Sequence, residues 1–200
     1  MRSTIKTLCV ATLLVALSGA AHATELFTID SNHASVGFSI KHMVVSKVRG
    51  SFGDVSGTIT YDPEDLSRSG VKVSIKTASV NTNNGDRDAH LRSPDFFDAE
   101  KNPEITFTSD TIERRGDGFV AQGKLTMHGV TREVSIPFTL NGPLTDPWGM
   151  TRIGIEAEPI VLDRTDFGLT WNKVLETGGV LVGNEVQVFI DLEAVRKAGE

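Results

Sequence analysis

The side chains best suited to chemistry gather in one short segment of the chain, residues 83–107. If this segment contains a helical turn, Arg87, His90 and Leu91 fall at i, i+3 and i+4 and share one face. A guanidinium there can donate hydrogen bonds to an oxygen-bearing group of a ligand. Two interpretations are open: a polar helix that plugs one end of a β structure, or a lid whose Arg87 and His90 meet the polar end of a ligand. A structural ion pair between Arg87 and Asp88 is the alternative to a ligand contact.

The flanking residues predict where this helix begins and ends. Asn83 or Asn84 can cap its start by accepting backbone N–H bonds. Asp86 favours the positive end of the helix dipole. Pro94 ends the helix, because the residue before a proline avoids helical angles. We therefore expect a short helix over residues 86–92.

Catalytic motifs are not evident in the sequence. The histidines after residue 23 belong to no HExxH motif, and no pair has the spacing of a familiar metal site. A GxSxG elbow is absent, and no cysteine follows Cys9. We expect no metal, no cofactor and no enzyme activity, although an acid–base pair of Asp88 and His90 stays open. The histidines concerned are His33, His42, His90 and His128.

Most of the remaining sequence alternates apolar and polar residues with the two-residue period of half-buried strands. Val36, Phe38 and Ile40 form one such series, and another occupies residues 186–192. About eight such strands, with turn signals roughly every ten residues, predict an antiparallel sandwich or barrel. A barrel of about this size is filled by side chains or holds one small ligand. The alternation does not decide between these interiors.

Several segments depart from the alternation. We expect a turn-rich loop over residues 141–149, irregular structure over residues 159–169 and a second helix over residues 194–198. Residues 48–61 contain spaced glycines, so they form either one strand bent by bulges or several short strands separated by turns. Pro137 lacks a backbone donor, which places its strand at an edge, at a bulge or near a barrel end.

The start of the chain has the pattern of a secretory signal peptide over residues 1–23. Arg2 and Lys6 precede an apolar stretch of about ten residues and a small-x-small cleavage sequence. The apolar stretch is shorter than the ~20 residues of a transmembrane helix, so we expect no transmembrane anchor. The mature chain would start near Thr24, form one domain over residues 24–200 and reside in the periplasm.

The charge balance excludes one class of partner. Cleavage removes two of 20 basic residues and none of 26 acidic residues, so 18 basic and 26 acidic residues remain, a formal net charge of about −8. Nucleic acid demands clustered cations, so we expect no nucleic-acid partner. The same balance argues against attachment to anionic lipid through a basic surface. Cys9 leaves with the signal peptide, and the mature chain therefore has no disulfide.

Several stretches of the chain resemble the YceI-like, polyisoprenoid-binding proteins. RDAHLRSPDFFDAEKNPEITF matches the signature RDxHLxSxDFFDxxxxPxIxF, and DSNHASVGFSIKHMVVSKVRGSFGDVSGTI, GKLTMHGVTREV, DRTDFGL and VGNEVQVFIDLEA are similar to other parts of the family. Together they cover nearly all of the chain after residue 25. The resemblance implies an all-β, lipocalin-like antiparallel barrel of about eight strands, with a short helical lid and a long apolar cavity. It also implies binding rather than catalysis and, by family habit, a homodimer.

On this resemblance we expect the protein to bind or carry an isoprenoid-type amphiphilic lipid, such as a polyprenyl or quinone tail. The alternative is an enzyme that acts on such an amphiphile at the cavity mouth. Burial of hydrocarbon contributes about 25 cal/mol per Å², so a long chain needs few polar contacts. Candidates for those polar contacts are Arg87, His90, His42 and Asn172. The expected ligand-binding residues are Phe38, His42, Met43, Arg87, His90, Leu91, Phe96, Phe97, Phe107 and Trp171.

Overall fold

The computed structural model describes residues 24–176 and 178–196, so the predicted signal peptide lies outside the described residues. Strands dominate this part of the chain. The strands are β1 (Glu25–Ile29), β2 (Ser35–His42), β3 (Ser46–Phe52), β4 (Val55–Tyr61), β5 (Gly70–Lys76), β6 (Val80–Asn81), β7 (Glu104–Arg115), β8 (Gly118–Met127), β9 (Val130–Thr145), β10 (Thr151–Ala157), β11 (Ile160–Asp163) and β12 (Val182–Arg196). The helices are α1 (Gly85–Arg92) and the 3₁₀ turns η1 (Ser31–His33), η2 (Leu66–Arg68), η3 (Thr77–Ser79) and η4 (Arg164–Phe167).

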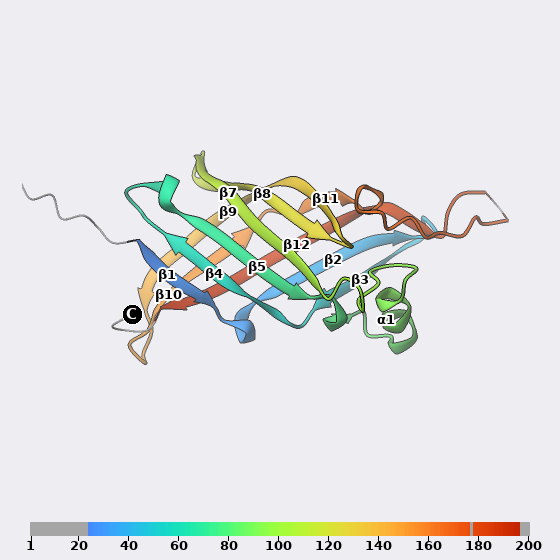
Figure 1. Cartoon of the computed structure of the whole chain (residues 1–200), viewed down its shortest axis with the longest axis horizontal. Coiled ribbons are helices and arrows are strands. Elements are labelled where there is room, and N and C mark those ends of the chain that lie inside the picture. Colours follow the sequence, from blue (N-terminus) through green and yellow to red (C-terminus); the bar gives the residue numbers. More distant parts are fainter. Residues whose placement is uncertain (1–23, 177, 197–200) are drawn as a thin grey trace, which may run out of the picture.

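Eight of the strands close into an antiparallel barrel. They follow one another in the order β1-β4-β5-β7-β8-β9-β10-β12, and β1 pairs back with β12 (Figure 1). This closure confirms the all-β barrel that the family resemblance implies, and it is one of the two architectures that the alternation predicts. In the described ranges, no helix combines the length and the hydropathy needed to cross a membrane.

The long strand β12 belongs both to the barrel and to an extension of it. Its C-terminal part pairs with β10 and β1, whereas its N-terminal part runs between β2 and β11. β2 then pairs with β3, β3 pairs with β6, and α1 follows β6 in the chain. Figure 1 shows α1 beneath β3, toward the end of the molecule opposite the start of β1.

The part of the barrel where β1 meets β12 is filled by side chains. Phe27, Ile59, Ile153 and Ala194 project inward from β1, β4, β10 and β12 and are 0–3% exposed. They are members of the apolar series in their strands, so the two-residue period places them inside. This end of the barrel is therefore packed, apart from a small cavity of about 20 Å³ beside Ile59.

Two predictions about short segments were wrong. Residues 159–169 are not irregular, because β11 adds to the edge of β12 and η4 follows it. The predicted helix at residues 194–198 is strand as far as Arg196, and residues 197–198 lie outside the described part. Ala194 pairs with both Ile153 and Ile29 there, so sheet pairing overrides the helix preference of alanine.

The structure also answers the sequence predictions for three further segments. The predicted loop at residues 141–149 is wrong in its first half, since β9 continues to Thr145 alongside β10. Residues 48–61 form two strands separated by a turn at Gly53, which is the second of the two interpretations. Pro137 adjoins Phe138, the residue of β9 opposite the last residue of β10, in agreement with a position near a barrel end.

Candidate ligand-binding site

Two adjoining cavities lie inside the molecule, toward the α1 end. The larger has a volume of about 280 Å³ and lies between α1, β2, β12 and the segment that follows β11. The smaller has a volume of about 130 Å³ and lies within the barrel. Five apolar residues line both, so the two cavities adjoin, and together we call them the path: Val36, Phe52, Met127, Leu162 and Val188.

The two cavities differ in their chemistry. Every residue that lines the smaller cavity is apolar, with Phe107, Phe138 and Ile155 among them. The larger cavity is also mainly apolar, but ionisable side chains occur along it, and none of its described lining residues is Asp or Glu. The ionisable lining residues are Lys41, His42, Arg87, His90 and Arg164. The path is therefore apolar in the barrel and basic near α1.

Helix α1 begins and ends as the flanking residues predict. The Asn84 side chain accepts the backbone N–H of Arg87 at 2.9 Å, which caps the first turn. At the other end, the backbone N–H and the hydroxyl of Ser93 both donate to the carbonyl of His90. These caps hold α1 over the larger cavity, to which Arg87, His90 and Leu91 contribute side chains.

Thr82 ties α1 to the end of β6. Asp88 accepts the hydroxyl of Thr82 at 2.5 Å and its backbone N–H at 2.8 Å. Arg87 donates to the hydroxyl and carbonyl oxygens of the same threonine at 2.8 and 2.9 Å. The Thr82 hydroxyl holds the pKa of Asp88 below its usual 3.8, although burial opposes this shift. Arg87 and Asp88 are thus joined through Thr82 rather than by the direct ion pair considered above.

His90 connects α1 to the segment after η4. Its Nε2 lies 2.9 Å from Asp95 Oδ2, and its ring packs edge-on against Phe96 and Trp171, with centroids 5.0 and 4.8 Å apart. The carboxylate partner of His90 is therefore Asp95, whereas Asp88 bonds to Thr82. Within the described residues, the ring nitrogens of His90 bond to no Ser or Thr hydroxyl, so no nucleophile completes a triad.

Comparison with known proteins identifies the family. A family model described as a YceI-like domain matches residues 27–194, most of the chain. The chain belongs to the YceI-like family. The UPF0312 protein ECA1782 of Pectobacterium atrosepticum is 36% identical to this YceI-like chain over 197 residues, which covers 98% of the chain and 99% of the relative.

Solved structures share the barrel. BcnA of Burkholderia cenocepacia has a TM-score of 0.72 and 23% identity, and the match covers 82% of this chain and 98% of BcnA. A polyisoprenoid binding domain from Saccharophagus degradans, implicated in plant cell wall breakdown, has a TM-score of 0.61 and 16% identity. That match covers 84% of this chain and 97% of the domain. At these identities the likeness concerns the fold.

The structure places the predicted ligand-binding residues of this YceI-like chain in three locations. Phe107 lines the smaller cavity. Met43 lies outside both cavities, in the turn after β2, with φ of 51° and 40% exposure. Asn172 binds the backbone of Val182 through its amide, so this candidate mouth residue braces a loop instead. The larger cavity is lined by Phe38, His42, Arg87, His90, Leu91, Phe96, Phe97 and Trp171.

Two residues at central positions of the path were not predicted. Leu162 lines both cavities from β11, and Arg164 lines the larger one from η4. The strand was hard to recognise because Ile160, Val161 and Leu162 are all apolar, which hides the two-residue period. The remaining signal was an Asp-Arg pair, Asp163 and Arg164, directly after an apolar run.

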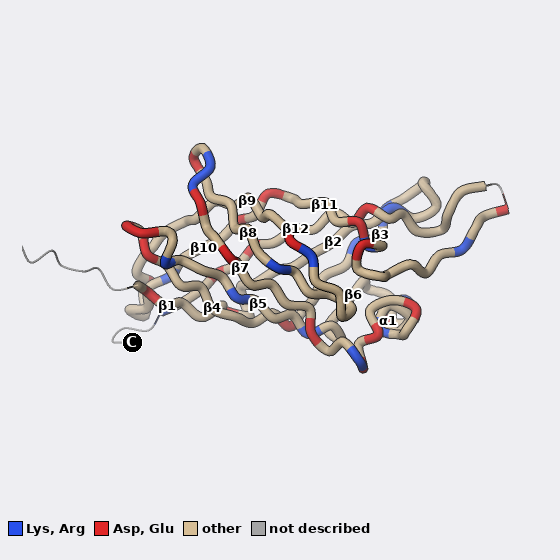
Figure 2. Tube along the Cα trace, turned by 45° about the horizontal axis from the view of Figure 1, so that its top comes forward, with Lys and Arg blue, Asp and Glu red and all other residues tan. Residues whose placement is uncertain are grey.

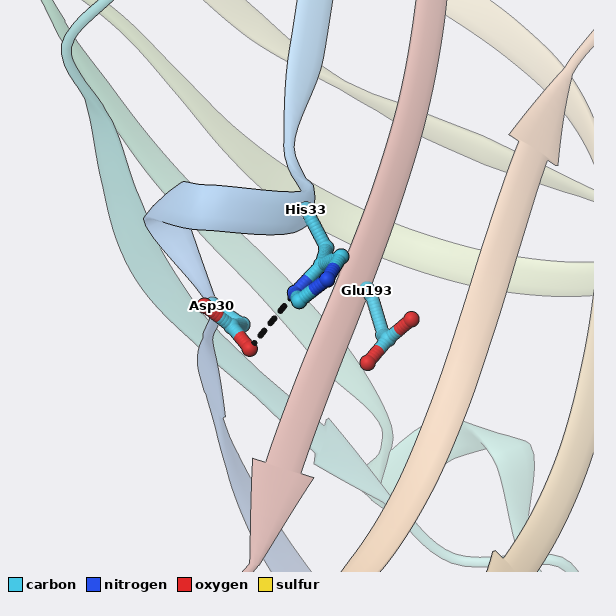
Figure 3. Close-up of side chains that lie close together, drawn as sticks. All are labelled: Asp30, His33 and Glu193. Carbon is cyan, nitrogen blue, oxygen red and sulfur yellow. Dashed lines mark hydrogen bonds and ion pairs between the residues drawn. The ribbon is translucent and has the colours of Figure 1, made fainter.

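A separate cluster of ionisable groups lies at the far side of the barrel. Figure 3 shows Asp30 bonded to His33, with Glu193 of β12 beside them, and their potential ligand atoms lie within 4.8 Å of one another. Arg152 Nη1 already bonds to Asp30, at 3.1 Å, and to Glu193, while its Nε bonds to Asp146 at 2.6 Å. The bonds to Asp146 and Glu193 raise the pKa of Arg152. This permanent cation bridges the three carboxylates and reduces their mutual repulsion, so we interpret the cluster as structural.

Proposed function

We propose that the protein binds an isoprenoid-type amphiphilic lipid in the two adjoining cavities. The apolar path through the barrel carries this proposal, because a hydrocarbon chain is the ligand that needs no polar partner there. The likeness to a polyisoprenoid binding domain supports it. We further propose that binding takes place in the periplasm, after residues 1–23 have been removed as a signal peptide.

The size and lining of the path fit such a ligand. Ligand cavities in proteins have volumes of about 300–1,000 Å³, and the two cavities together reach the lower part of this range. Each buried CH₂ group contributes roughly 0.8 kcal/mol, so a chain of several isoprene units gains affinity from burial alone. The length of the path and the basic groups near α1 would then select among amphiphiles.

Extraction of the protein tests the proposal. The protein is produced with its own leader in a bacterium that makes isoprenoid lipids, purified from the periplasmic fraction without detergent and extracted with organic solvent. Mass spectrometry is expected to find a long apolar molecule at a near-equal molar ratio. Protein that is consistently empty, and that binds no isoprenoid alcohol afterwards, would contradict the proposal. The same preparation shows whether the chain is exported and, by light scattering, whether it is the expected homodimer.

A matched pair of variants links the lipid to the cavities. Leu162 lines both cavities, whereas the neighbouring Val161 is 60% exposed on the outside of β11. Leu162→Trp is expected to fill the space between the two cavities and to reduce the recovered lipid at least tenfold. The larger side chain is also expected to lower the free energy of unfolding by about 1–3 kcal/mol. Val161→Trp makes the same chemical change on the other face of β11 and is expected to leave the lipid content unchanged.

We propose binding rather than catalysis as the role of this site. The observation that favours catalysis is the pair of His90 and Asp95 at the edge of the larger cavity. If His90→Ala abolishes turnover of an amphiphile while its binding persists, the catalytic alternative is correct. On the binding proposal, the variant changes affinity only.

A further inference from the structure

Arg164 is a buried cation at the wall of the larger cavity. It begins η4 directly after β11, and only 4% of the residue is exposed. Its Nε donates to the carbonyl of Gly183 at 2.9 Å, and its Nη1 donates to the carbonyl of Leu169. Both partners are neutral backbone groups, so they satisfy hydrogens of the guanidinium without cancelling its charge.

No carboxylate pairs with Arg164 among the described ion pairs. The nearest acid in the chain, Asp163, directs one carboxylate oxygen to the hydroxyl and N–H of Thr165, at 2.6 and 2.8 Å. Burial lowers the pKa of Arg164, and the negative charge of Asp163 opposes this shift. A guanidinium stays protonated in proteins, so the positive charge remains. Charges that are buried without a counter-ion are destabilising, which makes this position unusual.

The other arginines in similar positions have their charge compensated. Arg152 contacts three carboxylates, and Arg87 shares Thr82 with the neighbouring Asp88. Lys41 lines the larger cavity together with Arg164, and none of the described lining residues is acidic. Lys41 and Arg164 would therefore attract an oxyanion in this cavity, and no acidic side chain among the described lining residues opposes them.

We infer that the lipid bound by this protein is anionic, and that its oxyanion headgroup pairs with Arg164 in the larger cavity while its tail enters the barrel. A phosphate, a pyrophosphate or a carboxylate has this chemistry. The fully apolar smaller cavity lies beyond Leu162 and accepts the tail. This inference rests on the proposed function, and it narrows the ligand to one class of amphiphile. Arg164 would act as a binding residue for the headgroup.

Arg164 also has a structural role that any experiment must separate from binding. Its bonds to Gly183 and Leu169 join η4 to the start of β12 and to the segment that contains Trp171. Removal of the side chain would loosen this region and weaken all ligands alike. The decisive quantity is thus the ratio of affinities for a charged and a neutral ligand with the same tail.

The experiment measures that ratio in delipidated mature protein. Geranylgeranyl phosphate is compared with geranylgeraniol, and palmitate with hexadecanol, so that the two pairs distinguish a phosphate from a carboxylate headgroup. Trp171 lines the cavity and reports binding by fluorescence, while Trp148→Phe removes the signal of the exposed second tryptophan. The wild-type protein is expected to prefer at least one anion by about 10- to 100-fold, as a charge-assisted hydrogen bond provides.

Three variants test whether Arg164 causes the preference for anionic ligands. Arg164→Gln is expected to reduce the anion preference to about 1–3-fold while binding of geranylgeraniol persists. Arg164→Lys keeps the charge and is expected to retain most of the preference. Arg115→Gln, at the exposed last position of β7, is the control and is expected to behave as the wild type.

The outcomes separate the two proposals. If the wild type binds geranylgeraniol and geranylgeranyl phosphate equally, and palmitate and hexadecanol equally, the inference is wrong and the proposed function stands. If none of the four probes binds, the proposed function itself fails. If Arg164→Gln and Arg115→Gln keep the same preference as the wild type, the headgroup lies elsewhere. If Arg164→Gln does not fold, the inference is tested by two results: the ratio of affinities for charged and neutral ligands in the wild type, and whether Arg164→Lys keeps that ratio. Loss of the ratio in a folded Arg164→Lys would contradict the inference.

Discussion

Asp88 shows how one carboxylate positions α1. It is 8% exposed and receives both the hydroxyl and the backbone N–H of Thr82. The carboxylate has a pKa below 3.8 in the folded state, chiefly because of the Thr82 hydroxyl, so it stabilises the fold whenever it is ionised. This contribution is fully present above the ordinary pKa of an aspartate. It is lost as the pH falls below 3.8 through the lower folded pKa.

Asp88→Asn is therefore expected to lower the free energy of unfolding at pH 7, and the difference from the wild type should shrink as the pH falls from about 5 to 2. Urea unfolding followed at several pH values measures this. Asp86→Asn is the control, because Asp86 lies in the same helical turn with an exposed carboxylate. Equal losses in the two variants would mean that the helix dipole, rather than the bonds to Thr82, accounts for the effect.

At the scale of elements, the close approach of β7 and β8 depends on one glycine. Gly123 is buried opposite Ser109, next to a register shift in β7, and a Cβ there would lie 2.3 Å from the carbonyl oxygen of Thr108. Gly123→Ala is expected to destabilise the protein by about 1–3 kcal/mol, since the backbone must move apart. Gly53→Ala is the control, with no atom within 4 Å of the added methyl group. Denaturant midpoints that are the same for both would show that β7 and β8 separate without strain.

Elements with a clear local signal could be predicted from the sequence. The alternation in β2 and the caps of α1 led to correct strands and a correct helix, because these signals depend on a few neighbouring residues. β11 could not be predicted, since its three consecutive apolar residues show no visible period and the strand forms only because β12 offers an edge. Arg164 was not predicted because its hydrogen-bond partners, the carbonyls of Gly183 and Leu169, lie elsewhere in the chain and are brought to it only by the fold.

The whole molecule combines a packed end with a hollow one. Buried side chains such as Phe27 and Ile153 fill the barrel where β1 meets β12, while both cavities lie toward α1. Figure 2 shows basic and acidic residues interspersed over the strands and loops. Filled interiors gain dispersion contacts that hollow ones lack. We therefore expect the two ends to differ in local stability.

Hydrogen exchange of the delipidated protein tests this expectation. Amides of β1, β4 and β10 should exchange only through global unfolding, whereas those of α1, β3 and β11 should exchange through local opening at a lower free energy. A saturating lipid stabilises the state that binds it by about 2.7 kcal/mol at 100 times its Kd, and this protection should appear first in α1, β3 and β11. Leu162→Trp should remove the lipid-dependent protection, and Val161→Trp should retain it. If the lipid first slows amide exchange in β1 and β4, the lipid lies outside the cavities. A ligand that fills the hollow end must slow the local opening of that end before it slows global unfolding.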